Sequence, residues 1–353
     1  MKDYFSPSRR SVLKGGVALL AAPSVISSAV HAANSQITVS DVGGAISPAL
    51  RQAFYDPFEK QTGIRVVSVA QEANPVTQIK LLVDTKSYIW DVSMTTRDHI
   101  IRLMEGKPYV AELKLGLNPD DYITGAMQPT WMGFSVYGIA MALNTKSLPG
   151  AAPKTWADYW NVKDFPGRRG LYRSPLYTLE LALLADGVAP SKLYPLDVDR
   201  AFASLSRLRK NIAVWWTSGA QNTQILQSGE VDMCDTWSGR VYAAIAGGAP
   251  LKVNWNGLYS IDGWSIANGT PRMEAAQEFV KFSMRPEQQA IYSSLVANGP
   301  SAKKAYDSIT AERALVLPTA PANIAGLTLV DSDYWGAKNK ELTERFNEWL
   351  LAG

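Results

Sequence analysis

Apolar and polar residues alternate along residues 36–40, and this period of two predicts a β-strand. A serine and a proline at 47–48 pair a capping residue with a proline, which is typical of a helix start. Apolar residues then follow at a spacing of four over 50–58, so we expect a helix that ends near Gly63. A second strand is predicted over 64–69. A strand, a helix and a strand in this order predict a parallel sheet with helices on its faces.

Short strand-like runs and helical patterns continue to alternate along the chain, which predicts an α/β fold. A second α/β block begins near Lys154 and runs to about Trp255. No long Pro- or Gly-rich linker separates the two blocks, so we expect lobes joined by strands or short hinges. The pattern predicts further strands at 90–94, 170–172 and 231–234 and helices at about 199–210 and 221–228.

The first 33 residues have the pattern of an export signal. Arg9 and Arg10 precede a short apolar run at 17–22, and small residues lead to Ala32. The run is well short of the ~20 apolar residues that a membrane-spanning helix needs. We therefore predict that residues 1–33 are a twin-arginine signal peptide, which the Tat machinery exports to the periplasm and which is cleaved near Ala32. The alternative interpretation is a disordered basic tail.

Without this segment, the chain has a different balance of basic and acidic residues. The whole sequence has 35 basic and 32 acidic residues, but four of the basic and one of the acidic residues lie in the first 33. The remainder has no formal net charge. A protein that binds nucleic acid or an anionic membrane carries a cluster of excess basic residues, so we expect neither as a partner.

Residue counts limit the chemistry that the chain can perform. Cys234 is the only cysteine, so no intrachain disulfide is possible, and His99 is the only histidine outside the signal segment. Triads and zinc sites that need several histidines are excluded. The sequence has no Gly-rich phosphate loop, nucleophile elbow or calcium loop. We predict no catalytic residues, no metal and no cofactor.

Motifs in a fixed order carry a resemblance to a known family. They are the segment 58–64 before a strand, Thr-Trp-Ala-Asp-Tyr-Trp at 155–160, Ser-Gly-Glu-Val-Asp at 228–232, and the segment 284–290 followed by Asn-Gly-Pro at 298–300. In this order and spacing the chain resembles the extracellular solute-binding proteins of polyamine-type ABC importers, which bind spermidine or putrescine. The resemblance covers essentially the whole chain after the signal.

The resemblance implies the two-lobe periplasmic binding protein fold of type II, with a ligand cleft between lobes that are joined by two crossings. Lobe one would combine residues 36–142 with 261–307, and lobe two would combine 143–260 with 308–353. The protein would be a monomeric receptor and not an enzyme. It would close over a small organic amine and deliver it to a membrane permease.

Ligand sites of open α/β sheets gather at the carboxyl ends of strands. Asp235 and Trp237 follow the strand at 231–234 and place a carboxylate beside an aromatic face. This pair suits an ammonium group, through an ion pair and a cation–π contact of ~0.5–2 kcal/mol. The resemblance places an amine-stacking aromatic at Trp237. The alternative is that Asp235 caps a helix and Trp237 packs in the core.

A second loop leads into a strand at the expected crossing. By the resemblance, Asp262 matches the carboxylate that holds a polyamine amine, and Trp264 is a further stacking candidate. A buried aspartate needs a cationic partner, which is either the ligand or Arg240. Both partners remain open.

A third loop follows two adjacent tryptophans, Trp215 and Trp216. Neighbouring strand residues face opposite ways, so one of the two would pack in the core and the other would face the cleft. Trp216 and Ser218 are the candidates from this loop. Thr96, after the strand at 90–94, is a candidate hydrogen-bond donor from lobe one.

Two loops depart from the polyamine pattern. Gly43 and Gly44 stand where polyamine binders present aromatic residues, and outward backbone amides there suit a carboxylate, unless the glycines only form a tight turn. Ser174 and Tyr177 stand where carboxylates are expected, and fewer acids mean fewer ligand ammonium groups. If Arg240 or the two glycines meet a carboxylate, an ω-amino acid such as γ-aminobutyrate fits the residues as well as a diamine.

Two other classes remain as alternatives. An exported hydrolase or lyase on the same architecture would have only carboxylates, lysines or tyrosines for its nucleophile and base. A ferric-ion receptor of related shape would need clustered tyrosine or carboxylate ligands, and the sequence has no adjacent pair of tyrosines.

Overall fold

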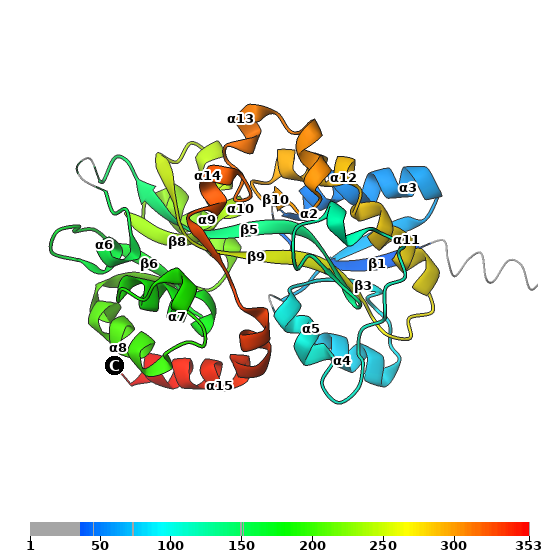
Figure 1. Ribbon diagram of the computed structural model, residues 1–353, viewed down its shortest axis with the longest axis horizontal. Helices are drawn as coiled ribbons and strands as arrows, with labels where there is room; N and C mark the ends of the chain where they lie inside the picture. Colours follow the sequence, from blue (N-terminus) through cyan, green and yellow to red (C-terminus); the bar gives the residue numbers. More distant parts are fainter. Residues whose placement is uncertain (1–35, 45, 73, 149, 151, 353) are drawn as a thin grey trace, which may run out of the picture.

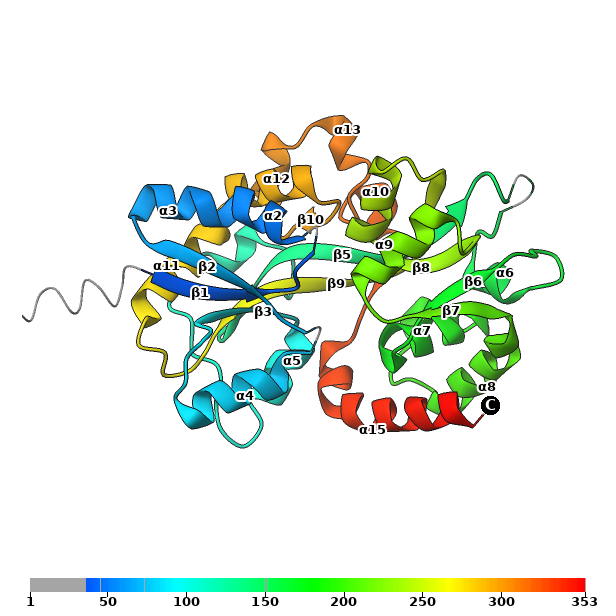
Figure 2. The ribbon, with the colours of Figure 1, turned by 180° about the vertical axis from the view of Figure 1, so that it is seen from behind.

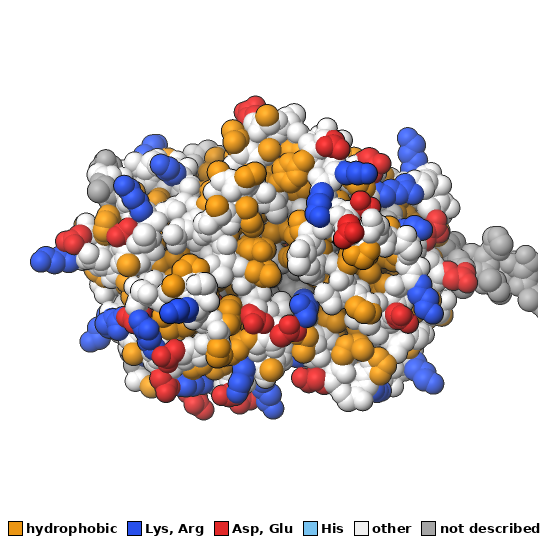
Figure 3. All heavy atoms as spheres, viewed as in Figure 1, with side chains coloured by type: hydrophobic (Ala, Val, Ile, Leu, Met, Phe, Trp, Pro, Cys, Tyr) orange, Lys and Arg blue, Asp and Glu red, His pale blue; other side chains and the backbone are white. Residues whose placement is uncertain are grey.

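A computed structural model describes residues 36–352 except positions 45, 73, 149 and 151 (Figure 1). The signal peptide predicted over 1–33 lies outside the described residues. Within the described ranges, no helix is both long and apolar enough to cross a membrane. On the face shown in Figure 3, basic and acidic side chains are interspersed, in line with the even charge balance of the sequence.

The described strands form one sheet that runs through the molecule (Figures 1 and 2). Two long antiparallel strands lie in its middle, with parallel strands on either side. In sheet order the main strands are β2 (Arg65–Ala70), β1 (Gln36–Asp41), β3 (Val92–Thr95), β9 (Leu251–Ile266), β5 (Trp131–Asn144), β8 (Met233–Trp237), β6 (Arg169–Tyr172) and β7 (Ile212–Trp216). The short strands β4 (Met127–Gln128) and β10 (Gly299–Pro300) pair with β5, and β11 (Leu327–Leu329) pairs with β9.

The predicted β-α-β unit is confirmed, because β1 and β2 are parallel neighbours. The helical segment between them ends where Gly63 adopts a left-handed φ of 75°, which a residue without a Cβ adopts without strain. Its apolar residues at a spacing of four are buried, as the pattern predicts. The segment consists of α2 (Ile46–Leu50), a π-helical turn over Arg51–Tyr55 and α3 (Asp56–Thr62).

A first hydrophobic core lies on the β1–β3 side of the sheet, beneath α2, α3, α11 (Met273–Ser283) and α12 (Pro286–Leu295). Trp264 of β9 stacks on Phe134 of β5 with 4.6 Å between ring centroids, and Phe54 meets both rings edge-on. Helices α4 (Val76–Thr85) and α5 (Arg97–Leu103) cover the opposite face with a smaller apolar cluster (Figure 1).

A second core lies on the β6–β8 side (Figures 1 and 2). The C-terminal helix α15 is anchored there by Trp335, whose indole N–H donates to the buried Glu180 at 2.5 Å. Its first turn also reaches α5 through an Arg97–Asp333 ion pair of 3.0 Å. The helices here are α6 (Trp156–Trp160), α7 (Pro175–Ala185), α8 (Val198–Leu208), α9 (Gly219–Ser228), α10 (Ser238–Ala246) and α15 (Ser332–Leu351), and the remaining short ones are α13 (Ala311–Ala314) and α14 (Pro321–Ile324).

Strands β5 and β9 contribute to both cores. Phe134 and Trp264 pack in the first core, while Ile139 and Leu258 pack in the second. The chain therefore crosses between the two halves along these strands, which is the two-lobe arrangement that the sequence predicts. The predicted lobe limits, which divide β5 after residue 142 and β9 after residue 260, stay predictions.

Most of the other predicted elements are present with ends shifted by one or two residues. The strand predicted at 231–234 is the exception, because β8 begins at Met233 and continues through Trp237. Residues that the sequence assigned to a loop are therefore part of a strand. This shift changes which side chains reach the site.

Candidate ligand-binding site

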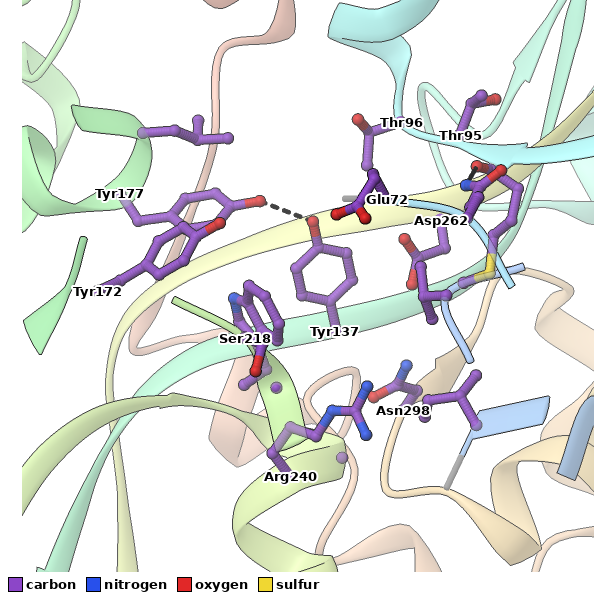
Figure 4. Close-up of a pocket in the computed structure, with 18 of the residues that line it drawn as sticks. Glu72, Thr95, Thr96, Tyr137, Tyr172, Tyr177, Ser218, Arg240, Asp262 and Asn298 are labelled. Carbon is purple, nitrogen blue, oxygen red and sulfur yellow. Dashed lines mark hydrogen bonds between the residues drawn. The ribbon is translucent and has the colours of Figure 1, made fainter. Parts of the chain in front are cut away.

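A cavity of about 280 Å³ lies between the two cores, with walls from both (Figure 4). Its floor comes from the crossing strands, through Tyr137 of β5 and Asp262 of β9. The first-core side contributes Val42, Ile46, Gln71, Glu72, Met94, Thr95, Thr96, His99, Tyr292 and Asn298. The second-core side contributes Tyr172, Leu176, Tyr177, Thr217, Ser218, Gly219, Trp237, Gly239 and Arg240.

The register of β5 and β9 positions the floor. Tyr137 stands opposite Ser260, and Ser135 stands opposite Asp262. Alternate residues of a strand face the same side, so Tyr137 and Asp262 lie on one face of the paired strands. Figure 4 shows both side chains directed into the cavity.

Asp262 has no hydrogen-bond or ion-pair partner among the described residues. In particular, no nitrogen of Arg240 lies within 4.0 Å of an Asp262 oxygen, so the intramolecular ion pair considered above is not formed in this structure. Burial raises the pKa of the Asp262 carboxyl to about 7, and the positive charge of Arg240 opposes this rise. A partly desolvated carboxylate in this state gains from a cation placed beside it.

Arg240 is the positive counterpart of Asp262 on the cavity wall. It lies in the first turn of α10, its side chain is buried, and it makes no hydrogen bond to any described residue. The guanidinium lies against the start of α9, where Ser218 caps the helix by accepting from the Gln221 amide. A guanidinium beside the positive end of a helix is a site for a carboxylate.

The position of Arg240 depends on the absence of a side chain at Gly219. A Cβ added to Gly219 would lie 2.8 Å from the Arg240 Cζ and nearer still to its Nε. Gly44 is also close, since a Cβ there would lie 3.6 Å from an Arg240 Nη. The arginine thus lies between two glycine backbones, one from each side of the cleft.

Tyr177 has an unusual backbone for a residue on the cavity wall. Its φ is 73° and its ψ is −44°, and together with Leu176 it interrupts the helical geometry of α7. For a residue other than glycine, such a conformation costs ~1–3 kcal/mol. The hydroxyl of Tyr177 lies 2.7 Å from that of Tyr137, and burial raises the pKa of both phenols, so both stay protonated.

Six of the twelve predicted site residues line this cavity. They are Thr96, Tyr177, Ser218, Trp237, Arg240 and Asp262. They come from both sides of the cleft and from the crossing strand, so the fold gathers residues that are far apart in the sequence. Their contact with a ligand stays a prediction.

Asp235, Trp216 and Trp264 do not line the cavity. Asp235 lies inside β8 and is fully buried, where its oxygens accept from the Trp216 indole at 2.7 Å and the Tyr172 amide at 3.2 Å. Burial raises the pKa of its carboxyl to about 7. Trp264 packs against Phe134 in the first core. All three side chains are fully buried and do not reach the cavity.

Gly43, Gly44 and Ser174 are also absent from the cavity lining. The Gly43 amide donates to the Asp41 carboxylate at 2.9 Å and is therefore not directed at a ligand. Both glycines have positive φ, 65° and 59°, so the tight-turn alternative describes their conformation. Ser174 precedes α7, and the next residues of that segment, Leu176 and Tyr177, reach the cavity instead.

Sequence reasoning missed Tyr137, Tyr172 and Glu72. Glu72 is the second residue after β2, so the rule that sites gather at strand ends applies to it as well. Tyr137 is hidden in a fourteen-residue strand that is buried throughout, and no polar alternation distinguishes it. Tyr172 ends β6 and stacks on Trp216 at 4.4 Å.

The structure offers little support for a metal centre in the described part of the chain. No group of three or more His, Cys, Asp or Glu side chains there is placed to hold an ion. His99 lines the cavity, but its Nδ1 accepts from the Thr96 amide at 3.3 Å as part of a helix cap. Burial lowers the pKa of His99, which favours its neutral form.

Two α/β cores joined by crossing strands, with a charged cavity between them, define a protein that encloses a small solute between two lobes. The chain belongs to the bacterial extracellular solute-binding protein family, whose model matches residues 53–319. It is 36% identical to the gamma-aminobutyric acid-binding protein of Pseudomonas aeruginosa, over 91% of this chain and 92% of that protein.

More distant similarity and solved structures agree with this assignment. The chain is 24% identical to spermidine/putrescine-binding periplasmic protein 1 of Haemophilus influenzae, over 75% of this chain and 77% of that protein. A crystal structure of an ABC transporter substrate-binding protein from Bradyrhizobium japonicum matches with a TM-score of 0.84 and 37% identity, over 90% of this chain and 99% of that one. The predicted family and two-lobe fold are confirmed.

The contact between Gly219 and Arg240 gives a testable prediction. In Gly219→Ala, the new methyl group should push the Arg240 side chain away from α9 while the helix stays intact, because alanine favours helices over glycine by up to ~1 kcal/mol. We expect the melting temperature to stay the same or rise, and any stabilisation by added γ-aminobutyrate, the ω-amino acid that the sequence leaves open, to fall. Differential scanning fluorimetry measures both quantities.

The control for this substitution is Gln224→Ala, at an exposed position of the same helix. It should leave both the melting temperature and the response to γ-aminobutyrate close to those of the wild type. An unchanged ligand response in Gly219→Ala would mean that the placement of Arg240 does not matter for binding.

Proposed function

We propose that this protein is the periplasmic substrate-binding component of an ABC importer for a small zwitterion, an ω-amino acid such as γ-aminobutyrate. One observation carries the proposal: Arg240 and Asp262 face the same cavity with opposite charges, are not paired with each other, and have no other partner among the described residues. A ligand with a carboxylate at one end and an ammonium at the other would satisfy both groups.

The size and shape of the cavity support a small ligand. About 280 Å³ is just below the range of volumes that bind drug-sized molecules, ~300–1000 Å³. Trp237 lies on the wall, where its ring face suits the ammonium end through a cation–π contact. The name of the Pseudomonas relative, a gamma-aminobutyric acid-binding protein, agrees with this ligand class.

A diamine such as putrescine is the other ligand that the sequence left open. It carries two ammonium groups and would place one of them within reach of Arg240, where like charges repel. The cavity offers Glu72 as a second carboxylate, but this side chain is exposed. The charges therefore favour the zwitterion over the diamine, although a diamine fits the names of more distant relatives.

The remaining parts of the proposal concern location and partners. Residues 1–33 would direct the chain through the Tat machinery to the periplasm, where it would act as a monomer and release its ligand to a membrane permease. It would bind its ligand without changing it. A ferric-ion receptor or an exported enzyme would instead show a coloured iron complex or ligand turnover.

Reciprocal substitutions test which group meets which end of the ligand. Arg240→Gln should weaken γ-aminobutyrate binding by about 100-fold, since a charged hydrogen bond is worth ~1.5–3 kcal/mol. It should not weaken, and is expected to strengthen, any putrescine binding. Asp262→Asn should weaken both ligands. Isothermal titration calorimetry of the mature chain measures the dissociation constants.

The matched control for this pair is Asp235→Asn, which changes a neighbouring buried carboxyl outside the cavity. It is expected to lower the melting temperature without changing the preference between the two ligands. If Arg240→Gln weakened putrescine as much as γ-aminobutyrate, a zwitterion site between Arg240 and Asp262 would be wrong.

The raised pKa of Asp262 predicts a pH dependence of binding. The ligand ammonium requires the ionised carboxylate, and in the free protein Asp262 is half protonated near pH 7. Below that pH binding must release a proton, so affinity should fall about tenfold between pH 8 and pH 6 and level off above pH 8. γ-Aminobutyrate stays zwitterionic over this range, because its own groups titrate near ~4 and ~10.

Calorimetry in buffers of different ionisation enthalpy measures the proton release directly. We expect nearly one proton released per ligand at pH 6 and close to none at pH 8. Affinity and proton release that both stayed constant from pH 6 to pH 8 would show that the ligand does not engage the Asp262 carboxylate.

A further inference from the structure

The strained segment at the start of α7 places Tyr177 in the cavity. Pro175 occupies the first helical position, but Leu176 and Tyr177 then leave helical geometry before the helix resumes. The positive φ of Tyr177, 73°, is a conformation that residues with a Cβ seldom adopt. The residue is nevertheless only 5% exposed and lies on the cavity wall. A strained residue that is held in a binding site is a candidate for a role there.

The ring of Tyr177 is supported from two sides. Its hydroxyl lies 2.7 Å from the hydroxyl of Tyr137 on the crossing strand, as the dashed line in Figure 4 marks. Tyr172 lies alongside it, with 6.2 Å between ring centroids, and Tyr172 in turn stacks on the buried Trp216 at 4.4 Å. The wall that these rings form is held in place by a hydrogen bond and by packing.

We infer that the Tyr137–Tyr177 pair is the wall that limits the length of the ligand. This inference rests on the proposed function, because it assumes a ligand held at its two ends by Arg240 and Asp262. Arg240 and Asp262 fix the distance between the two charged ends of the ligand. Each additional methylene must therefore make the carbon chain of the ligand bulge sideways into the cavity. On the side of Tyr177 that space is closed by rings.

The hydroxyls of the pair strengthen this discrimination. The two hydroxyls form a hydrogen bond with each other, and both residues are buried. A longer ligand that displaced Tyr177 would therefore break this hydrogen bond inside the protein. The two rings of the pair carry no charge that would hold a second ammonium. A binding site of this kind rejects longer chains both by volume and by the hydrogen bond that they would break.

The test compares a series of ω-amino acids that differ by one methylene: 4-aminobutyrate, 5-aminovalerate and 6-aminohexanoate. The wild type should bind the first most tightly and lose about tenfold or more in affinity with each added methylene. Tyr177→Gly removes the ring at a position whose φ suits glycine, and should reduce that loss to less than about threefold per methylene. Tyr177→Phe, the matched control, keeps the ring and should retain most of the wild-type length preference.

A second variant guards against a folding defect in Tyr177→Gly. Tyr137→Val opens the same wall from the crossing strand with a side chain that suits strands, and it should relax the length preference in the same way. The inference is overturned if the folded variants keep the wild-type ratios, or if the wild type binds all three ligands equally. If the wild type binds none of the three, the proposed function fails and the length limit fails with it, an outcome that the wild-type data alone identify.

Discussion

Two opposite charges that share one cavity without neutralising each other are the central constraint of this structure. Arg240 and Asp262 are both largely removed from water, and burial raises the pKa of Asp262 to about 7 although the positive charge of Arg240 opposes the rise. No cation among the described residues lies within ion-pair distance of Asp262. Leaving them apart costs stability, and that cost persists only because the scaffold fixes both positions. A zwitterion that bridges them recovers the lost electrostatic energy, and this gain is available to drive closure of the two lobes.

The scaffold fixes the two charges through different elements, the strand β9 and the helix α10. Asp262 is fixed by the register of β9 on β5, the two strands that pass through both cores. Arg240 is fixed by the first turn of α10 and by the close approach of the Gly219 backbone. Both crossing strands pack into each core, and the walls of the cleft come from both sides of it. A floor and walls built in this way suit a receptor that closes by hinge motion.

The sequence predicts the fold well because the signals of helices and strands are local and periodic. An example is the helix in which Leu50, Phe54 and Phe58 recur at a spacing of four. Half of the site residues that it predicts line the cavity for a related reason, since the pattern of apolar residues shows roughly where each strand ends.

The differences between prediction and structure arise where the ends of strands were misplaced. A strand placed at 231–234 put Asp235 in a loop, whereas β8 extends to Trp237. The aspartate side chain is therefore buried within the sheet, where it accepts from Trp216 and Tyr172, and only Trp237 reaches the cavity. Likewise Asp262 and Trp264 share a face of β9, but the tryptophan lies two residues further along, beneath the helices of the first core. A difference of two residues along a strand decides whether a side chain meets ligand or core, and sequence patterns do not locate strand ends that closely.

A crystal structure of the mature protein with γ-aminobutyrate bound tests the central claim most directly. The carboxylate of the ligand should lie within hydrogen-bond distance of the Arg240 guanidinium, and its ammonium within the same distance of an Asp262 oxygen, with the carbon chain beside Trp237. A ligand bound in the reverse direction, or one that contacts neither charge, would contradict the account.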